Sequence, residues 1–327
     1  MLLKIFAGRN LIIQYAIVVV SFILIFSVPV TIVKPVGYSP LYDILYNLIA
    51  DSKLAVHIVF VIFSLIPILY TQFILTFHGL IDRNNKVFLL FAPILMYSYA
   101  GAWVVSPAMV SSLFVIFGIG VIFSTSEQEH SVKGFTFAAI LFAIGTMFYS
   151  ANFFSVLFLI LAVYIFKQFN FRDMLALITS FLLPFIYLFT FYFINNQFNL
   201  KFAEFISSFS NIGLDLSYNS DVFSTIYYVV FLIVSLFVIA SIVFNQRNIL
   251  IQNRKYISFL MWILSIELIM LLFTNYNWAY HFVYIMFFMS IFYTLSFANK
   301  KVNWIFEIIL IFYIINDINI IRIMLDY

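Results

Sequence analysis

The sequence predicts an all-α, multi-pass integral membrane protein with about eleven transmembrane helices. Hydrophobic residues make up 65% of the 327-residue chain and charged residues only 9%, whereas about 25% of residues are charged in ordinary soluble domains. A water-soluble fold could not cover its surface with so few charges, so lipid must solvate much of it. Apolar stretches also follow one another almost without pause, so residues 1–327 are expected to form a single polytopic domain.

The individual spans follow from the lengths of the apolar stretches. Roughly 20 apolar residues cross the hydrocarbon core of a bilayer. Four consecutive stretches from Val87 to Phe166 are shorter and form two hairpins. We expect the outer ends of these hairpins to form the bottom of a cavity that is open to the outside. Polar residues crowd the outer half of the last stretch, so the count is ten or eleven. The predicted spans are Leu11–Val33, Leu54–Phe77, Val87–Val105, Ala108–Ser124, Gly134–Tyr149, Phe153–Phe166, Met174–Ile194, Val222–Phe244, Ile257–Phe273, Ala279–Phe297 and Trp304–Leu325.

Lysine and arginine are unevenly divided between alternate turns. With the N-terminus on the cytoplasmic side, twelve of the sixteen cations fall on that side, and only Lys34, Lys53, Lys201 and Arg322 fall outside. Cations are held on the cytoplasmic side during membrane insertion. The sequence therefore predicts a cytoplasmic N-terminus.

Two outer loops are longer than hairpin turns. In Pro40–Asp51 the apolar residues recur at i, i+3, i+4, i+7 and i+8, and a similar spacing begins at Phe202 in Asn195–Asp221. This spacing places the apolar side chains on one face of a helix. We therefore expect two short amphipathic helices that lie in the outer interface with their apolar sides toward lipid.

Asp43 is the first candidate for chemistry. It lies on the polar face of the first interfacial helix, where a carboxylate facing water or the cavity mouth could act as general base for a bound hydroxyl. Asp51 follows two turns later, about 80° around the helix, so it could flank the same site. The alternative is that both acids merely solvate the polar side of this helix.

Glu267 is the most deeply placed acid. It lies about ten residues into the span Ile257–Phe273, and acids inside a membrane are costly and usually face the protein interior. Glu267 is therefore expected either to bond to a neighbouring helix or to contact a proton or substrate. His281 and Arg322 could approach the same outer half of the bundle.

Trp278 opens the tenth span at the outer surface. A tryptophan there is typical of an interfacial aromatic belt, and it could equally stack on a sugar ring. We expect no metal and no cofactor, because the chain has no cysteine, its four histidines are scattered, and it has neither a P-loop nor a G-x-G-x-x-G motif. No basic stripe interleaved with aromatics indicates nucleic acid as a partner.

The order of these features resembles the GT-C class of membrane glycosyltransferases. The shared features are a long first span, an outer loop with an amphipathic helix and an acid, and paired short helices. In that class the acid of the first outer loop is the base, and the sugar donor is a polyprenyl-phosphate lipid that enters from the bilayer. The resemblance implies that Asp43 is the base and that Asn195–Asp221 helps to bind the donor.

A second resemblance covers nearly the full length. The start Phe6-Ala-Gly-Arg9-Asn10, the hairpin Asn84-Asn-Lys-Val-Phe…Ala92-Pro93 and the segment Phe148-Tyr-Ser-Ala-Asn-Phe are similar to a family of polytopic membrane proteins of flavobacteria, known only as a domain of unknown function. This resemblance implies a bacterial cytoplasmic (inner) membrane.

Three functions stay open on the sequence alone. The best hypothesis is transfer of a sugar from a polyprenyl-phosphate donor at the outer face, with Lys34, Lys53 or Lys201 holding the diphosphate by charge. One alternative is a lipid or solute transporter that uses Glu267, which predicts an internal repeat; the sequence shows no such repeat. The other is a non-catalytic membrane subunit. Membrane lipids are partners in each case, and the oligomeric state is left open.

Overall fold

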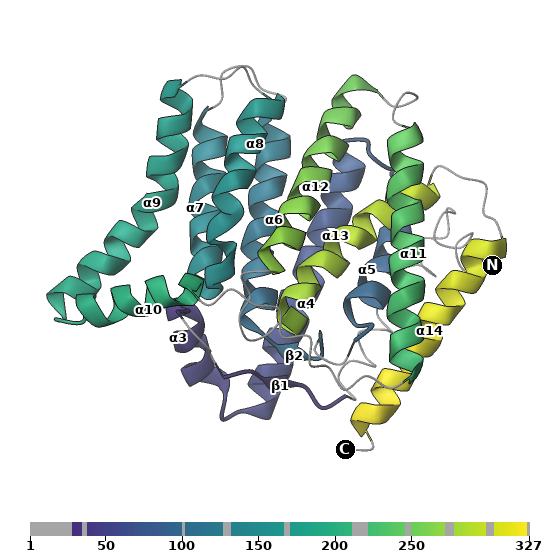
Figure 1. Ribbon diagram of the computed structural model, residues 1–327, viewed down its shortest axis with the longest axis horizontal. Coiled ribbons are helices and arrows are strands. Elements are labelled where there is room, and N and C mark those ends of the chain that lie inside the picture. The colour runs from purple at the N-terminus through teal and green to yellow at the C-terminus, as the bar shows by residue number, and fades with distance from the viewer. Residues whose placement is uncertain are drawn as a thin grey trace.

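The computed structural model describes residues 28–34, 38–99, 102–126, 132–166, 171–210, 222–245, 250–271, 278–298 and 304–325. Within these ranges nearly all of the chain is helical (Figure 1), so the all-α prediction is confirmed. The described α-helices are α3 (Pro40–Ile49), α4 (Lys53–Phe77), α5 (Val87–Met96), α6 (Pro107–Ser126), α7 (Val132–Phe148), α8 (Val156–Phe166), α9 (Phe171–Ile194), α10 (Phe198–Ser210), α11 (Val222–Asn245), α12 (Ile251–Met270), α13 (Trp278–Ala298) and α14 (Trp304–Leu325).

Five of the described helices are long and apolar enough to cross a membrane, judged by length and composition. This supports the class of membrane protein but not a count of eleven spans. Helix α12 is not one of the five, because charged residues lie along it: Arg254, Lys255 and Glu267. The five apolar segments are Lys53–Phe77, Pro107–Ser126, Phe171–Ile194, Ile226–Phe244 and Tyr280–Phe297.

The helical hairpin of α6 and α7 lies in the well-packed part of the bundle. A Cβ added at Gly118 would lie 2.3 Å from the Phe142 ring, and one at Gly134 would lie 2.0 Å from Thr125 Oγ1. Small residues let helix backbones approach closely, which is a main source of helix association where lipid removes the hydrophobic drive. The glycines therefore hold α6 and α7 in direct contact.

Helix α9 has the opposite environment. In the most apolar 18-residue stretch of α9, only 17% of the residues are buried inside the protein, compared with 89% in the corresponding stretch of α13. Helix α9 lies at the edge of the molecule (Figure 1). Large apolar side chains such as Tyr187, Phe191 and Phe193 are 60–70% exposed. A soluble protein rarely exposes such a continuous apolar surface, so α9 presents the surface expected of a lipid-facing helix.

Helix α5 is much shorter than its apolar stretch. The predicted span Val87–Val105 is helical only to Met96, after which the chain turns and forms strand β2 (Val104–Val105). Strand β2 pairs in parallel with β1 (Thr31–Ile32). The prediction of one continuous helix is therefore wrong here.

Side chains explain how this irregular backbone is tolerated. Trp103 Nε1 donates to the Tyr97 carbonyl at 3.1 Å, and Asn316 Nδ2 donates to the Ser98 carbonyl at 2.8 Å. Non-helical backbone at membrane depth is stable only where the protein supplies its hydrogen-bond partners. Apolar periodicity carries no information about such partners, so it could not reveal where the helix ends.

The N-terminal prediction is also corrected in part. Most of the predicted span Leu11–Val33 lies outside the described residues, but its last part is strand β1 rather than helix. The Val33 amide donates to the Val105 carbonyl at 3.1 Å and extends the pairing of β1 with β2. The strand pair, α3 and α10 lie at the same end of the helix bundle, the lower end in Figure 1.

Candidate functional site

Helix α3 is anchored to the strand pair by a buried tyrosine. Pro40 occupies the start of the helix, a position where its missing N–H and fixed backbone angle cause no loss. Two residues later, the hydroxyl of Tyr42 lies 2.9 Å from the Val33 carbonyl and 2.7 Å from the Val105 carbonyl. The position of α3, and with it Asp43, is therefore fixed by the two strands.

Asp43 is half-buried and lies near charges from a second element. Burial raises the pKa of its carboxyl above the ordinary value of 3.8. A hydrogen bond from Ser39 Oγ to Oδ1 at 3.3 Å opposes this shift, and so does the positive charge of Lys201, whereas the negative charge of Glu204 adds to it. A carboxylate made more basic in this way is suited to accept a proton.

Lys201 and Glu204 form an ion pair on α10. Lys201 Nζ lies 2.7 Å from Glu204 Oε2, and this hydrogen bond raises the pKa of Lys201. Both side chains are partly exposed. Pairs of this kind contribute only about 0–1 kcal/mol to stability, so Lys201 is free to exchange Glu204 for a stronger anion at little cost.

Tyr38 connects this polar cluster to aromatic residues. Its ring stacks on Phe189 of α9 with centroids 6.2 Å apart and meets Phe205 of α10 edge-on at 5.1 Å. Burial raises the pKa of Tyr38 well above its ordinary value, so the hydroxyl remains protonated. Tyr38 precedes Ser39 and Asp43, so the polar cluster adjoins the aromatic walls of α9 and α10.

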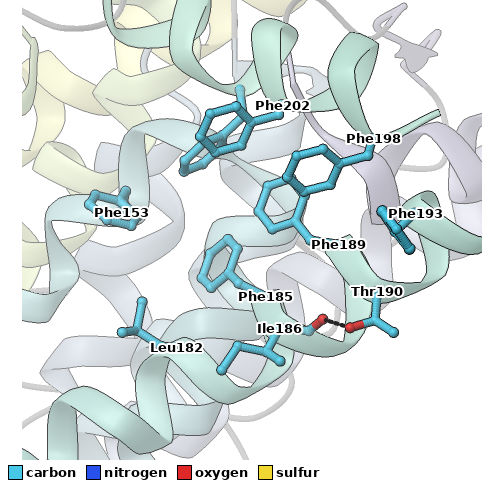
Figure 2. Close-up of a pocket in the computed structure, with 10 residues that line it drawn as sticks. Phe153, Leu182, Phe185, Ile186, Phe189, Thr190, Phe193, Phe198 and Phe202 are labelled. Carbon is cyan, nitrogen blue, oxygen red and sulfur yellow. Dashed lines mark hydrogen bonds between the residues drawn. The ribbon is translucent and has the colours of Figure 1, made fainter. Parts of the chain in front are cut away.

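Between α9 and α10 lies an apolar groove of about 550 Å³, shown in Figure 2. Thr190 supplies the one side-chain hydroxyl, and it donates to the Ile186 carbonyl at 2.7 Å rather than to the groove. The groove therefore offers a hydrocarbon ligand aromatic faces and no competing polar group. Its lining residues are Phe153, Leu182, Phe185, Ile186, Phe189, Thr190, Phe193, Phe198, Phe202 and Phe205.

The cavity differs from the one predicted. The short hairpins were expected to floor it, but the groove is formed by α9, α10 and Phe153, which belongs to the 3₁₀ helix η2 (Ser150–Ser155). The hairpin helices α6 and α7 pack closely against each other instead. Helix length alone could not reveal this, because glycine contacts close the space between them.

The structure separates the three lysines predicted to hold phosphate. Lys201 is the one that contributes to the pKa of Asp43. Lys34 and Lys53 are exposed and make no such contribution, and Asp51 is exposed between α3 and α4. Of these predicted residues, the structure thus brings together Asp43 and Lys201.

Two further predicted residues are placed by their helices. Arg322 is exposed in the last turn of α14. Trp278 is the first residue of α13, but its side chain lies outside the described residues. Stacking of Trp278 on a sugar stays a prediction.

Glu267 lies nearer a helix end than the sequence predicted. Helix α12 begins at Ile251, not Ile257, and ends at Met270, so Glu267 is in its last turn. The first turn of α12 contains polar residues that were assigned to the preceding loop, although polar side chains do not prevent a helix. His281 lies in the first turn of α13.

Glu267 and His281 face each other in a fully buried cluster. Both side chains are 0% exposed, and His281 Nε2 lies 3.3 Å from Glu267 Oε2. The same nitrogen lies 2.9 Å from the Glu267 carbonyl, and Nδ1 lies 3.4 Å from the Tyr149 hydroxyl. The sequence placed these two residues in the same outer half of the bundle, and the structure brings them into contact.

Several residues of both clusters were missed by the sequence reasoning. Ser39 precedes Asp43 by one helical turn, and Glu204 follows Lys201 at i+3, so helical spacing could have indicated both contacts. Tyr149 and Asn152 come from the turn between α7 and α8 and give no such signal. Asn152 Nδ2 donates to Ser111 Oγ and to the Tyr284 hydroxyl, contacts that only the tertiary packing creates.

This geometry was compared with known families, curated proteins and solved structures. No model of a protein family matches the chain, no curated protein matches it, and no solved structure matches it. The fold and the site define a class, an all-α protein with membrane-compatible helices and an apolar groove beside a polar cluster at one end.

Proposed function

We propose that this protein transfers a sugar from a polyprenyl-phosphate donor to an acceptor hydroxyl, in the manner of the GT-C membrane glycosyltransferases. Asp43 is the general base, Lys201 binds the donor phosphate, and the groove between α9 and α10 holds the first part of the polyprenyl chain. The site would lie at the outer face of a bacterial inner membrane, with the N-terminus in the cytoplasm.

The observation that carries this proposal is the direct junction of two chemically different surfaces. On one side lies a half-buried carboxylate within the field of a lysine. On the other lies an apolar groove of about 550 Å³ that is open to the flank of the peripheral helix α9. A lipid-linked sugar phosphate has the same division, because a charged phosphate joins a hydrocarbon chain to a polar sugar.

The reaction follows from the positions of these groups. The Asp43 carboxylate takes the proton of the acceptor hydroxyl, and the acceptor oxygen attacks the anomeric carbon of the donor sugar. The bond from that carbon to the phosphate oxygen breaks, and the polyprenyl phosphate leaves with the electron pair. The positive charge of Lys201 stabilises the negative charge that develops on the leaving phosphate.

The Lys201–Glu204 pair has a role in donor binding. In the free protein Glu204 accepts the hydrogen bond of Lys201. The donor phosphodiester carries one negative charge shared by two non-bridging oxygens, so it can take the place of the Glu204 carboxylate at the ammonium group; when the bond to the sugar breaks, the leaving phosphate gains a second negative charge, which strengthens its pairing with Lys201. Glu204 thereby keeps the lysine oriented without binding it so tightly that the donor is excluded.

The membrane arrangement belongs to the same proposal. We infer that the shorter apolar helices α5, α7 and α8 also lie within the bilayer beside the five long ones, as the sequence predicts for about eleven spans. Helices α3 and α10 would lie in the outer interface, where their exposed apolar residues contact lipid. Ile44 and Leu48 of α3 are 57% and 76% exposed, and Ile206 of α10 is 52% exposed.

The test compares two acids of the same loop. In nanodiscs with a synthetic polyprenyl-phosphate sugar and an alcohol acceptor, Asp43→Asn is expected to lower the transfer rate at least about 100-fold, since a positioned general base contributes that much or more. Asp51→Asn is the matched control, because Asp51 is exposed, and it should keep the wild-type rate. Equal rates for wild type and Asp43→Asn would contradict the proposal.

A second pair of variants tests the groove. Phe189→Trp adds volume at the groove wall and should raise the KM for the long-chain donor while leaving the rate with a water-soluble, short-chain donor unchanged. Phe237 of α11 is 55% exposed and does not line the groove, so Phe237→Trp is the control. A KM for the long-chain donor that does not change in Phe189→Trp would place the chain elsewhere.

A further inference from the structure

We propose that Glu267 and His281 form a buried proton-binding site that exchanges its proton through Tyr149. This site is separate from the Asp43 cluster and does not depend on the proposed glycosyltransfer. The pair holds one exchangeable proton, either on the carboxyl of Glu267 or on Nδ1 of His281. The geometry of three groups supports this.

The contacts of His281 determine where its own N–H lies. Nε2 is 2.9 Å from the backbone carbonyl of Glu267, and a carbonyl oxygen only accepts hydrogen bonds. Nε2 must therefore carry a hydrogen, and in the neutral imidazole Nδ1 is the unprotonated nitrogen. The Tyr149 hydroxyl at 3.4 Å then donates to Nδ1.

The surroundings of Glu267 require a proton at the pair. Among the described residues, neither carboxylate oxygen of Glu267 accepts a hydrogen bond, and the side chain is fully buried. The closest cationic partner is His281 Nε2 at 3.3 Å. An ionised carboxylate beside a neutral imidazole would be an uncompensated buried charge, which is strongly unfavourable. One added proton compensates this charge. On Glu267 it gives a neutral carboxylic acid, and on Nδ1 of His281 it gives an imidazolium that pairs with the carboxylate.

The other titratable groups at the site do not change the assignment of one proton to the Glu267–His281 pair. Tyr149 faces the pair from the turn before η2, and Tyr284 faces it from α13, one turn beyond His281. The Tyr284 hydroxyl accepts a hydrogen bond from Asn152. Helix α8 also packs on α12, and its one titratable side chain, Tyr164, is 74% exposed. No lysine or arginine faces Glu267 from the described helices around it, so His281 is its cationic partner.

Tyr149 provides the step that connects the pair to its surroundings. Its hydroxyl passes a proton to Nδ1 and takes up another proton from a solvent water on the same oxygen, so the tyrosine ends as it began. Tyr149 is only partly buried, whereas His281 is 0% exposed. Among the described residues, the hydroxyl of Tyr149 is the hydrogen-bond partner of Nδ1, so we assign the path from outside the cluster to this hydroxyl.

The experiment measures the proton directly in the full-length protein in nanodiscs. Infrared difference spectra between wild type and Glu267→Gln report the protonated carboxyl, and nitrogen NMR of ring-labelled histidine, assigned with His281→Gln, reports whether Nδ1 is protonated. We expect one of the two groups to carry the proton at neutral pH. The proposal is overturned if Glu267 is ionised and Nδ1 of His281 is unprotonated under the same conditions.

A milder variant tests the route and remains informative if Glu267→Gln does not fold. Tyr149→Phe keeps the ring and removes only the hydroxyl. After transfer to heavy water, hydrogen–deuterium exchange at the pair should slow by at least about 100-fold, the lower range for a positioned proton-transfer group. Tyr164→Phe, on an exposed tyrosine, is the matched control and should exchange at the wild-type rate. Unchanged exchange in Tyr149→Phe would overturn the route.

Discussion

Asp43 and Glu267 are two carboxylates near the α3–α10 end of the same bundle, and their surroundings differ in almost every respect. Asp43 is half-buried, accepts a hydrogen bond from Ser39 and lies within the field of two charged residues of α10. Glu267 is fully buried, its carboxylate accepts no hydrogen bond from the described residues, and the His281 imidazole lies 3.3 Å from it.

This difference separates two uses of an acid. A half-exposed carboxylate can be reached by a substrate, and its charge is partly screened by solvent, so it can ionise and act as a base. A fully buried carboxylate interacts strongly with a single neighbour, so the neighbour's protonation decides its state. The first environment is suited to catalysis on a bound molecule, and the second to holding a proton.

The largest expected effect concerns stability at the buried pair. His281→Ala should lower the free energy of unfolding by about 3–5 kcal/mol, because it leaves Glu267 buried without its partner. Ser39→Ala removes the partner of Asp43 and should cost only about 0.5–1.5 kcal/mol, the usual contribution of one hydrogen bond. Denaturant-induced unfolding in mixed micelles, followed by circular dichroism, measures both.

The double variant Glu267→Gln/His281→Ala provides the control for this comparison. It removes the carboxyl that His281→Ala leaves unpaired, so it should be more stable than His281→Ala alone, which is the non-additivity expected of contacting residues. Equal losses for His281→Ala and Ser39→Ala would show that the two acids are not energetically different.

The general architecture could be predicted from the sequence because it depends on composition and periodicity. Helix α14 has the same bounds as its predicted span, Trp304–Leu325, and α4 begins one residue before its prediction. The end of α5 at Met96 could not be predicted, because its backbone carbonyls are satisfied by Trp103 and by Asn316 from a distant helix. Long-range partners of this kind leave no mark on local apolar patterns.

The candidate site, like the fold, could be predicted from the sequence only in part. Helical periodicity placed Asp43 on the polar face of a short helix, and the distribution of cations marked Lys201 as a residue of the second outer loop, but neither pattern could show that the two lie close together. Their meeting depends on Tyr42, which fixes α3 to the strands, and on Tyr38, which packs between Phe189 and Phe205. These are contacts between residues far apart in the chain, so only the folded structure reveals them.

The pH dependence of transfer should distinguish Asp43 from Glu267. A base acts when it is deprotonated, so the rate should fall as the pH drops through the pKa of Asp43. Ser39→Ala and Lys201→Met each remove a group that lowers this pKa, so both should move the acid limb of the kcat/KM profile to higher pH. A pH–rate profile of each variant checks the direction.

Glu204→Gln should shift the acid limb of the kcat/KM profile in the opposite direction. The negative charge of Glu204 raises the pKa of Asp43, so its neutralisation should move the acid limb to lower pH. Tyr149→Phe, at the other carboxyl site, should leave the acid limb in place. Movement of the limb in Tyr149→Phe and not in Ser39→Ala would assign the titrating group to the buried pair.

The smallest expected effect is on the stability of Asp43→Asn. Because burial raises the pKa of Asp43 in the folded protein, the folded state binds a proton more tightly than the unfolded state. The free energy of unfolding therefore falls as the pH rises from the unfolded pKa through the raised folded value, and it is then constant. Asp43→Asn has no such decrease, so above that range it should be at least as stable as wild type.

That result would set Asp43 apart from residues that serve packing alone, because a substitution that removes activity without loss of stability indicates a group placed for function at a cost in stability. Glu267→Gln gives the contrast, since Gln retains the shape of Glu but its amide N–H₂ faces the N–H of His281 or is left unpaired in the core. Thermal unfolding of the two variants at neutral pH measures the difference. A larger loss for Asp43→Asn than for Glu267→Gln would reverse the assignment of the two sites.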